Sequence, residues 1–189
     1  AWWHPQNIPA GFHQLGHTYE RFHNPNCALD PLLVAREIVP GALAPPIGWD
    51  FTPQTFRVDE IWDDEGSEGA NNGGLWRPIP PPGYRCLGTF ATGGFGYAPP
   101  DGWQYTTYVH PINQQVAAAA ENFRCVREDL LVPARVKEWG WDDRGSGAYL
   151  GTTMWEIDPA ETRGDHSGVD VGHFVATRTY EMPTEPLYT

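Results

Sequence analysis

Two stretches of this 189-residue chain repeat each other at an offset of 79 residues. Each stretch has a Trp-Asp-Asp triplet, a turn with Gly and Ser, and a second Trp further along. The triplets begin at Trp62 and Trp141, and the second tryptophans are Trp76 and Trp155. Because both pairs of tryptophans keep the same offset, the two elements repeat as one unit. A fixed period of this kind is typical of a fold assembled from similar supersecondary units.

A third copy, less complete, lies at the N-terminus. The stretch from Trp3 to Gly16 shares with the stretch from Trp76 to Gly88 a Trp-x-Pro start, a Pro-x-Gly turn followed by an aromatic residue, and a closing Leu-Gly. The ends of the two copies with the 79-residue offset also match, since residues 172–177 resemble residues 88–92. We therefore predict one domain, 1–189, built from pseudo-repeats at about 1–60, 61–139 and 140–189.

The order of residues within a unit predicts antiparallel hairpins. A strand ends at Trp-Asp-Asp, turns through Gly and Ser, and returns through Trp-x-Pro. The chain has 21 Gly and 19 Pro, a content that suits many short strands joined by tight turns. The alanine run 117–120 is the one stretch that suggests a short helical turn. We expect an all-β fold, a β-prism in which three sheets surround a pseudo-threefold axis and Trp3, Trp76 and Trp155 pack toward it.

Three stretches carry a resemblance to a known family. They are Ile61-Trp62-x-Asp64-x-Gly66-Ser67-x-Gly69-Ala70, then Leu75-Trp76-Arg77-Pro78-Ile79-Pro80-Pro81-x-Gly83-Tyr84-x-x-Leu87-Gly88, and Cys125-Val126-Arg127-x-Asp129-Leu130. In these stretches the chain resembles the vacuolar protein sorting-associated protein 62 family and is similar to the multivesicular-body-associated β-prism domain. The resemblance implies the prism fold. It also implies a basic membrane-binding surface in the multivesicular-body relatives, which this acidic chain lacks.

The charge balance excludes several classes of partner. There are 24 acidic and 12 basic residues, a net charge of −12, and Lys137 is the single lysine. Without clustered cations, sequence-independent nucleic-acid binding and docking on anionic membranes are disfavoured. No apolar run approaches the roughly 20 residues of a transmembrane helix. Glycans, other neutral ligands, cations and basic partners remain open, and high Trp and Tyr content with a single lysine leans toward an extracellular, secreted setting.

The acidic hairpins are the main candidate ligand site. Asp63, Asp64 and Ser67 in one unit match the second triplet and its serine, which are Asp142, Asp143 and Ser146. Carboxylate and turn oxygens can bind Ca²⁺, and the same groups can hydrogen-bond sugar hydroxyls. The alternative is structural, because Asp and Ser commonly bond the amides of their own turns. Apart from this calcium, we expect no cofactor.

An extra aromatic loop is the second candidate. The stretch 95–108 has no counterpart in the other units, and its Trp103, Tyr105 and Tyr108 offer flat faces that suit sugar rings. Loops added to a regular scaffold often carry binding function. The alternative is that the loop folds back and packs its own aromatic residues.

Histidines and cysteines give weaker signals. His13 and His17 would point to the same face of a strand, and His173 stands in the repeat position that matches His17. These histidines can be unrelated structural residues, and the alternative is that they bind a metal ion together. Cys27, Cys86 and Cys125 allow at most one internal disulfide.

The chain lacks the Gly-x-Ser-x-Gly, phosphate-loop and dinucleotide-binding motifs. We therefore expect a non-catalytic, lectin-like recognition module. The alternatives are a metal-dependent hydrolase that uses the three histidines, and an assembly or targeting domain of a larger trafficking or toxin-type protein. The chain starts at Ala1, directly before the Trp strand, so we expect either a trimmed chain or closure of the first unit by a strand at 186–189.

Overall fold

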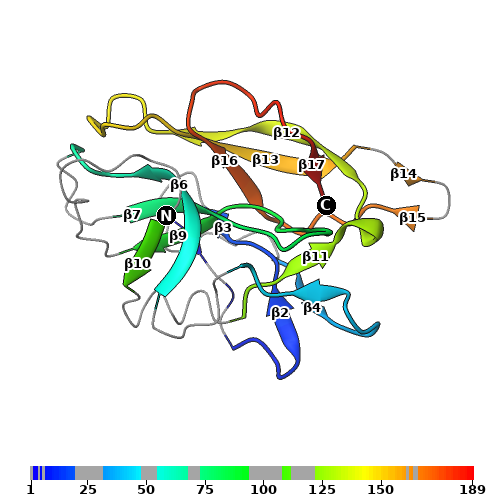
Figure 1. The fold of residues 1–189 in the computed structure, drawn as a ribbon. Coiled ribbons are helices and arrows are strands. Elements are labelled where there is room, and N and C mark those ends of the chain that lie inside the picture. The colour runs from blue at the N-terminus through cyan, green and yellow to red at the C-terminus, as the bar shows by residue number, and fades with distance from the viewer. Residues whose placement is uncertain are drawn as a thin grey trace.

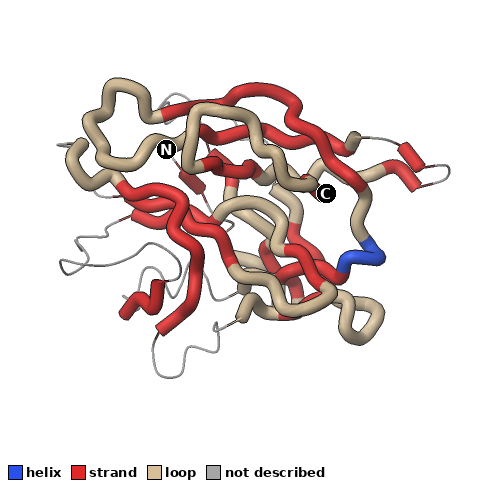
Figure 2. The backbone as a smooth tube through the Cα atoms, turned by 45° about the horizontal axis from the view of Figure 1, so that its top comes forward, coloured by secondary structure: helices blue, strands red, loops and turns tan. Residues whose placement is uncertain are grey.

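The structure is a computed structural model that describes residues 2–3, 5, 7–19, 32–47, 55–67, 73–93, 108–111, 122–160, 162–163 and 166–189. Within these residues the chain is all-β, as predicted, and its one helical element is the three-residue 3₁₀ turn η1, Glu128–Leu130 (Figure 2). The strands are β1 Trp2–Trp3, β2 Phe12–Gln14, β3 Thr18–Tyr19, β4 Val34–Arg36, β5 Leu43–Ala44, β6 Thr55–Asp63, β7 Gly73–Pro78, β8 Tyr84–Arg85, β9 Phe90–Gly93, β10 Tyr108–Pro111, β11 Cys125–Arg127, β12 Pro133–Asp142, β13 Thr153–Pro159, β14 Thr162–Arg163, β15 His166–Ser167, β16 Phe174–Thr177 and β17 Leu187–Tyr188.

Two four-stranded antiparallel sheets contain the repeated hairpins. Their strand orders are β10-β6-β7-β9 and β16-β13-β12-β17, and the hairpins β6–β7 and β12–β13 are the two that the 79-residue offset predicts. The long β12–β13 hairpin crosses the top of the molecule in Figure 1. Each hairpin has an irregularity at the same place, because the register shifts between Glu60 and Trp62 in β6 and between Trp139 and Trp141 in β12. The repeat therefore includes a β-bulge as well as the turn.

The faces of the two sheets meet in a shared core. This core is made of Ile61, Trp62, Leu75, Ala91, Met154, Phe174 and Ala176. Trp76 and Trp155, predicted as packing residues, are 2% and 8% exposed. Their indole N–H groups donate to Thr92 Oγ1 at 2.8 Å and to Thr177 Oγ1 at 3.1 Å. Each tryptophan therefore buries its ring without leaving a donor unsatisfied. The side chain of Trp3 lies outside the described residues.

The remaining described strands form smaller sheets. The three-stranded sheet β5-β11-β8 and the two-stranded sheets β1-β3, β2-β4 and β14-β15 complete the described strands. A second apolar cluster is made of Leu15, Leu87, Val126 and Val171.

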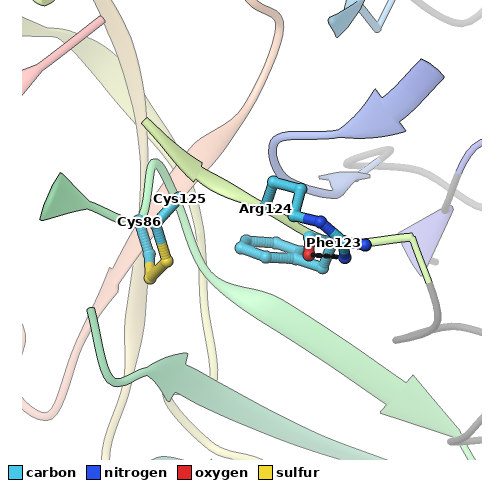
Figure 3. Close-up of a disulfide and its surroundings, with 4 residues drawn as sticks. All are labelled: Cys86, Phe123, Arg124 and Cys125. Atoms are coloured by element: carbon cyan, nitrogen blue, oxygen red, sulfur yellow. Dashed lines mark hydrogen bonds between the residues drawn. A yellow bond between two sulfur atoms is a disulfide. The ribbon is translucent and has the colours of Figure 1, made fainter. Parts of the chain in front are cut away.

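A disulfide joins Cys86 to Cys125 next to this cluster (Figure 3). In the β8–β11 ladder Arg85 pairs with Val126, so Cys86, directly after β8, stands opposite Cys125 at the start of β11. The disulfide is thus a cross-strand link, in agreement with the prediction of at most one internal disulfide. Cys27 lies outside the described residues.

The expected pairing of the C-terminal strand differs from the structure. The strand expected at 186–189 forms as β17, but it pairs with Pro133 and Ala134 of β12 and not beside Trp2–Trp3, so closure of the first unit by this strand is wrong. The repeat limits after residues 60 and 139 fall inside β6 and β12. The alanine run 117–120 lies outside the described part of the chain. No described helix has the length and apolar character needed to cross a membrane.

Candidate functional site

The two Gly-Ser turns lie side by side at one end of the molecule, on the left in Figure 1. The amide N–H of Tyr149 donates to the carbonyl of Glu65 at 2.9 Å. Gly66 and Gly147 have φ values of +89° and +84°, and a Cβ on Gly66 would stand 2.8 Å from the carbonyl oxygen of Gly147. Glycine is thus required both by backbone conformation and by the close approach of the turns. Groups from two repeats are therefore brought onto one surface.

Asp63 and Asp142 hold the first residues of these turns. Asp63 Oδ1 accepts the amide of Glu65 at 3.0 Å, and Asp142 Oδ1 accepts the amide of Arg144 at 3.0 Å. Both are Asx-type turns of the kind named as the structural alternative. Asp142 Oδ2 also pairs with the Arg144 guanidinium at 3.3 Å. The second oxygen of Asp63 has no hydrogen-bond or ion-pair partner among the described residues.

Asp64 and Asp143 each bond across their own hairpin, to an amide at or next to the start of the returning strand. Asp64 Oδ1 accepts the amide of Gly73 at 3.0 Å, and Asp143 Oδ1 accepts the amide of Thr152 at 2.8 Å. Asp143 is only 4% exposed, and its Oδ2 accepts the indole N–H of Trp62 at 2.8 Å. The hydrogen bond from Trp62 links one repeat to the next, and together with the bond from Thr152 it occupies both oxygens of Asp143.

The two serines occupy equivalent places in the turns. The amide of Ser67 donates to the carbonyl of Asp64 at 3.0 Å, and the amide of Ser146 donates to the carbonyl of Asp143 at 2.9 Å. Ser146 Oγ in addition accepts the amide of Ala148 at 3.1 Å. The serines therefore help to fix the turns while lying at the surface beside the carboxylates.

Two exposed tyrosines border the turns, and sequence reasoning missed both. Tyr149 is 76% exposed, and its ring packs against Gly66. Tyr180 is 41% exposed, and the guanidinium of Arg144 lies 4.5 Å from the centre of its ring. Burial and the nearby Asp143 carboxylate raise the pKa of Tyr180. The one available signal was the position of Tyr149 just after the Gly-Ser-Gly-Ala turn. We call Asp63, Ser67, Asp142, Ser146 and Tyr149 the hairpin patch.

The aromatic-loop candidates fall mostly outside the described residues. This is the case for Trp103, Tyr105 and the side chain of Tyr108. The backbone of Tyr108 belongs to β10 and pairs with Val58. Val58 is five residues before Asp63 on the same strand, or about 17 Å along an extended strand. The backbone of Tyr108 therefore lies well away from the hairpin patch.

The three histidines do not come together as metal ligands. Within the described ranges, no group of three or more His, Cys, Asp or Glu side chains is placed to hold an ion. His17 is 1% exposed, its Nδ1 accepts the amide of Ala91 at 3.1 Å, and its ring lies 4.6 Å from that of Phe90. Burial lowers the pKa of His13, and the positive charge of Arg124 lowers it further by a smaller amount.

His173 occupies a closed position between two glycines. A Cβ on Gly16 would lie 2.7 Å from the His173 Cβ, and one on Gly88 would lie 2.8 Å from its Cδ2, so neither glycine leaves room for a larger residue. The histidine is 5% exposed, and neither of its ring nitrogens has a hydrogen-bond partner in the part of the chain that the structure describes. Burial lowers the pKa of His173 to about 4, which keeps it neutral at pH 7.

Comparison with known proteins confirms the resemblance seen in the sequence. The family model described as vacuolar protein sorting-associated protein 62 matches residues 1–187. Comparison with curated proteins finds no match. Among solved structures, the crystal structure of GNIP1Aa from Chromobacterium piscinae is similar with a TM-score of 0.67 and 23% sequence identity. The match covers 98% of this chain and 29% of GNIP1Aa, and it is a likeness of fold.

Proposed function

The chain belongs to the vacuolar protein sorting-associated protein 62 family, and from this premise we propose that it is a non-catalytic recognition domain with a β-prism architecture. Two four-stranded sheets with matching hairpins and a shared core support the prism, as does the likeness to GNIP1Aa over nearly the whole chain. The third sheet of the prism would be supplied by the N-terminal unit, whose Trp-x-Pro and Leu-Gly motifs match those of the second.

We propose that the ligand is a glycan and that the hairpin patch contacts it. One observation carries this proposal, namely that turns from two repeats meet beside an exposed aromatic ring. Tyr149 offers a flat face for a sugar ring, and the free oxygen of Asp63 is an acceptor for sugar hydroxyls. Asp64 and Asp143 hold the hairpins in place, while Trp103, Tyr105 and Tyr108 in the aromatic loop would add stacking contacts.

The test is a glycan array probed with the intact protein, followed by affinity measurements on variants. Tyr149→Ala and the double variant Asp63→Asn/Asp142→Asn should each weaken binding about tenfold or more, because each removes a stacking face or charged acceptors. Trp103→Ala should weaken binding as well. Ile38→Ala is the matched control, since Ile38 is 83% exposed on the turn between β4 and β5. A blank array at high protein concentration would reject the glycan proposal.

The proposal requires no cofactor, and calcium, which prefers hard oxygen ligands, is the ion to test. If calcium takes part, dialysis against a chelator should abolish binding and added calcium should restore it. We also propose an extracellular setting. Its support is the Cys86–Cys125 disulfide, because such bonds persist in oxidising compartments.

A further inference from the structure

A groove of about 500 Å³ lies between the first four-stranded sheet and the segment that follows β16. Asp59, Ile61 and Arg77 line it from β6 and β7, and the segment 177–185 lines it from the other side. In Figure 1 this segment is part of the red loop that runs from β16 to β17. The volume is within the range of about 300 to 1,000 Å³ that is typical of small-ligand sites.

The wall formed by the segment 177–185 is held in shape by side-chain hydrogen bonds. Thr177 Oγ1 accepts the indole N–H of Trp155 at 3.1 Å and donates to the carbonyl of Thr179 at 2.8 Å. Thr179 Oγ1 in turn accepts the amide of Glu181 at 3.3 Å. Beyond Thr177, the last residue of β16, this wall has no regular secondary structure, yet the buried Trp155 of the adjacent strand β13 fixes its first turn. The groove is therefore formed before any ligand arrives.

Two arginines attach the wall to the opposite sheet. Arg178 donates from Nε to the carbonyl of Glu60 at 2.8 Å, and its Nη2 donates to the same oxygen. Toward the far end, Arg77 Nη2 lies 2.8 Å from Glu185 Oε1, and these side chains are 38% and 52% exposed. Both guanidinium groups are thus held in place and still have N–H groups to offer. The groove is bounded by these two attachments.

The charge of the groove is nearly balanced. Its lining has three carboxylates, Asp59, Glu181 and Glu185, and the guanidinium groups of Arg77 and Arg178. Asp59 and Glu181 form no ion pair with any described residue. A strongly charged ligand would meet groups of its own sign, whereas a neutral ligand with many hydroxyls could donate to the carboxylates and accept from the guanidinium groups.

An apolar edge lies beside these polar groups. Met182 is 63% exposed and is followed by Pro183, and both line the groove. The combination of fixed donors, unpaired acceptors and a small apolar surface matches the two faces of a sugar ring, which has polar hydroxyls at its rim and C–H groups on its face. We propose that this groove is a saccharide-binding site for a neutral sugar residue, distinct from the hairpin patch, an inference that rests on the proposed glycan-binding function.

The test titrates neutral monosaccharides, hexoses and N-acetylhexosamines, into the ¹⁵N-labelled protein at millimolar concentrations. Saturable shifts of the Thr179, Glu181 and Thr184 amide signals are expected for at least one sugar. The double variant Asp59→Asn/Glu181→Gln should weaken that binding about tenfold or more, because it replaces both unpaired carboxylates. The matched control is Glu138→Gln/Asp158→Asn, which changes two carboxyl groups that do not line the groove and should leave the affinity within twofold.

The possible outcomes separate this site from the hairpin patch. If no sugar shifts the groove amides, or if groove and control variants bind equally well, the groove proposal is overturned. If the glycan found on the array loses affinity in Tyr149→Ala but not in Asp59→Asn/Glu181→Gln, the groove proposal also fails while the proposed function stands. If sugars bind the groove and the array gives no ligand that depends on the hairpin patch, the groove stands and the hairpin proposal fails.

Discussion

Asp143 and His173 are both buried polar side chains, and the protein accommodates them in opposite ways. Asp143 receives two hydrogen bonds, from the Thr152 amide and the Trp62 indole. His173 has no hydrogen-bond partner among the described residues and is held in its neutral form. A satisfied carboxylate stabilises the contact between two repeats, whereas an unsatisfied imidazole makes stability depend on pH.

We predict that acid destabilises the protein through His173. The unfolded chain binds a proton at this position near its ordinary pKa of 6.5, but the folded chain binds it only near 4. Between these values the unfolded state holds more protons, so the free energy of unfolding falls as the pH falls from 6.5 to 4. The difference corresponds to about 3 kcal/mol below pH 4. Among the described residues, the exposed Asp170 is the charged group that opposes this shift.

The measurement is denaturant unfolding of the wild type and of His173→Phe and His173→Leu at steps from pH 7 to pH 4. The carboxylates titrate in all three proteins, so the histidine contribution is the difference between their curves. Both variants should lose less stability over this range than the wild type does. Equal losses in all three proteins would show that His173 is not the acid-sensitive group.

At the level of strands, the bulge that recurs in β6 and β12 explains why residue 140 is a glycine, although it lies outside the Gly-Ser turn. The irregularity in β6 has the buried Ile61 at its centre, and the equivalent position in β12 is Gly140. A Cβ on Gly140 would lie 1.5 Å from the hydroxyl oxygen of Tyr19. That hydroxyl donates to Glu156 Oε1 at 3.0 Å. The missing side chain thus admits a tyrosine from the N-terminal unit into the bulge.

Gly140→Ala should therefore destabilise the protein by about 1 to 3 kcal/mol, the range for an overpacked site. The cost should arise from displacement of Tyr19, and chemical denaturation can measure it. Tyr19→Leu serves as the second change, because it removes the ring that the new methyl group would meet. In the Tyr19→Leu background, Gly140→Ala should cost clearly less. Strict additivity of the two substitutions would contradict this account.

The sequence predicts the hairpins well because their signals are local. Glycine, serine and the Trp-Asp-Asp triplet recur at one offset, and β6–β7 and β12–β13 follow from them. The contact between Gly66 and Gly147 could not be predicted in this way, since a repeat does not say how its copies are oriented. The exposure of Tyr149 depends on that orientation, and so does the burial of Asp143. The aspartates and serines of the hairpin patch could therefore be predicted from the sequence, whereas the contact between the turns and the place of Tyr149 could be found only in the folded structure.

For the whole molecule, the disulfide is a covalent link between distant parts of the sequence. Cys86 and Cys125 are 39 residues apart in sequence. In the chain-entropy account, closing a loop of this length stabilises the folded state by about 4 kcal/mol, because it restricts the unfolded chain. The double variant Cys86→Ala/Cys125→Ala should lose about that amount. The free energy of unfolding under non-reducing conditions is the quantity to measure.

Wild-type protein unfolded in the presence of a thiol reductant provides the matched comparison, because its chain is unchanged except for the bond. It should approach the stability of the double variant. A loss below about 1 kcal/mol in both cases would contradict the entropic estimate. The pairing of Cys86 with Cys125 was beyond sequence reasoning because it depends on the register of β8 against β11, two strands that are distant in sequence.

The groove was equally beyond prediction from the sequence. The shape of the segment 177–185 depends on Thr177 and Arg178, which bond to two different sheets. Neither residue belongs to a recognisable motif. The family and the all-β fold could be predicted, in contrast, because their motifs recur along most of the chain.

The position of the disulfide also determines what a protease can release. The disulfide closes residues 86–125 into a covalent ring, and the chain continues as one tail before residue 86 and another after residue 125. Hydrolysis of a single peptide bond in either tail yields two separate fragments. Hydrolysis of a single peptide bond within the ring opens it and releases no fragment, so the nicked protein stays one covalently linked molecule until the disulfide is reduced.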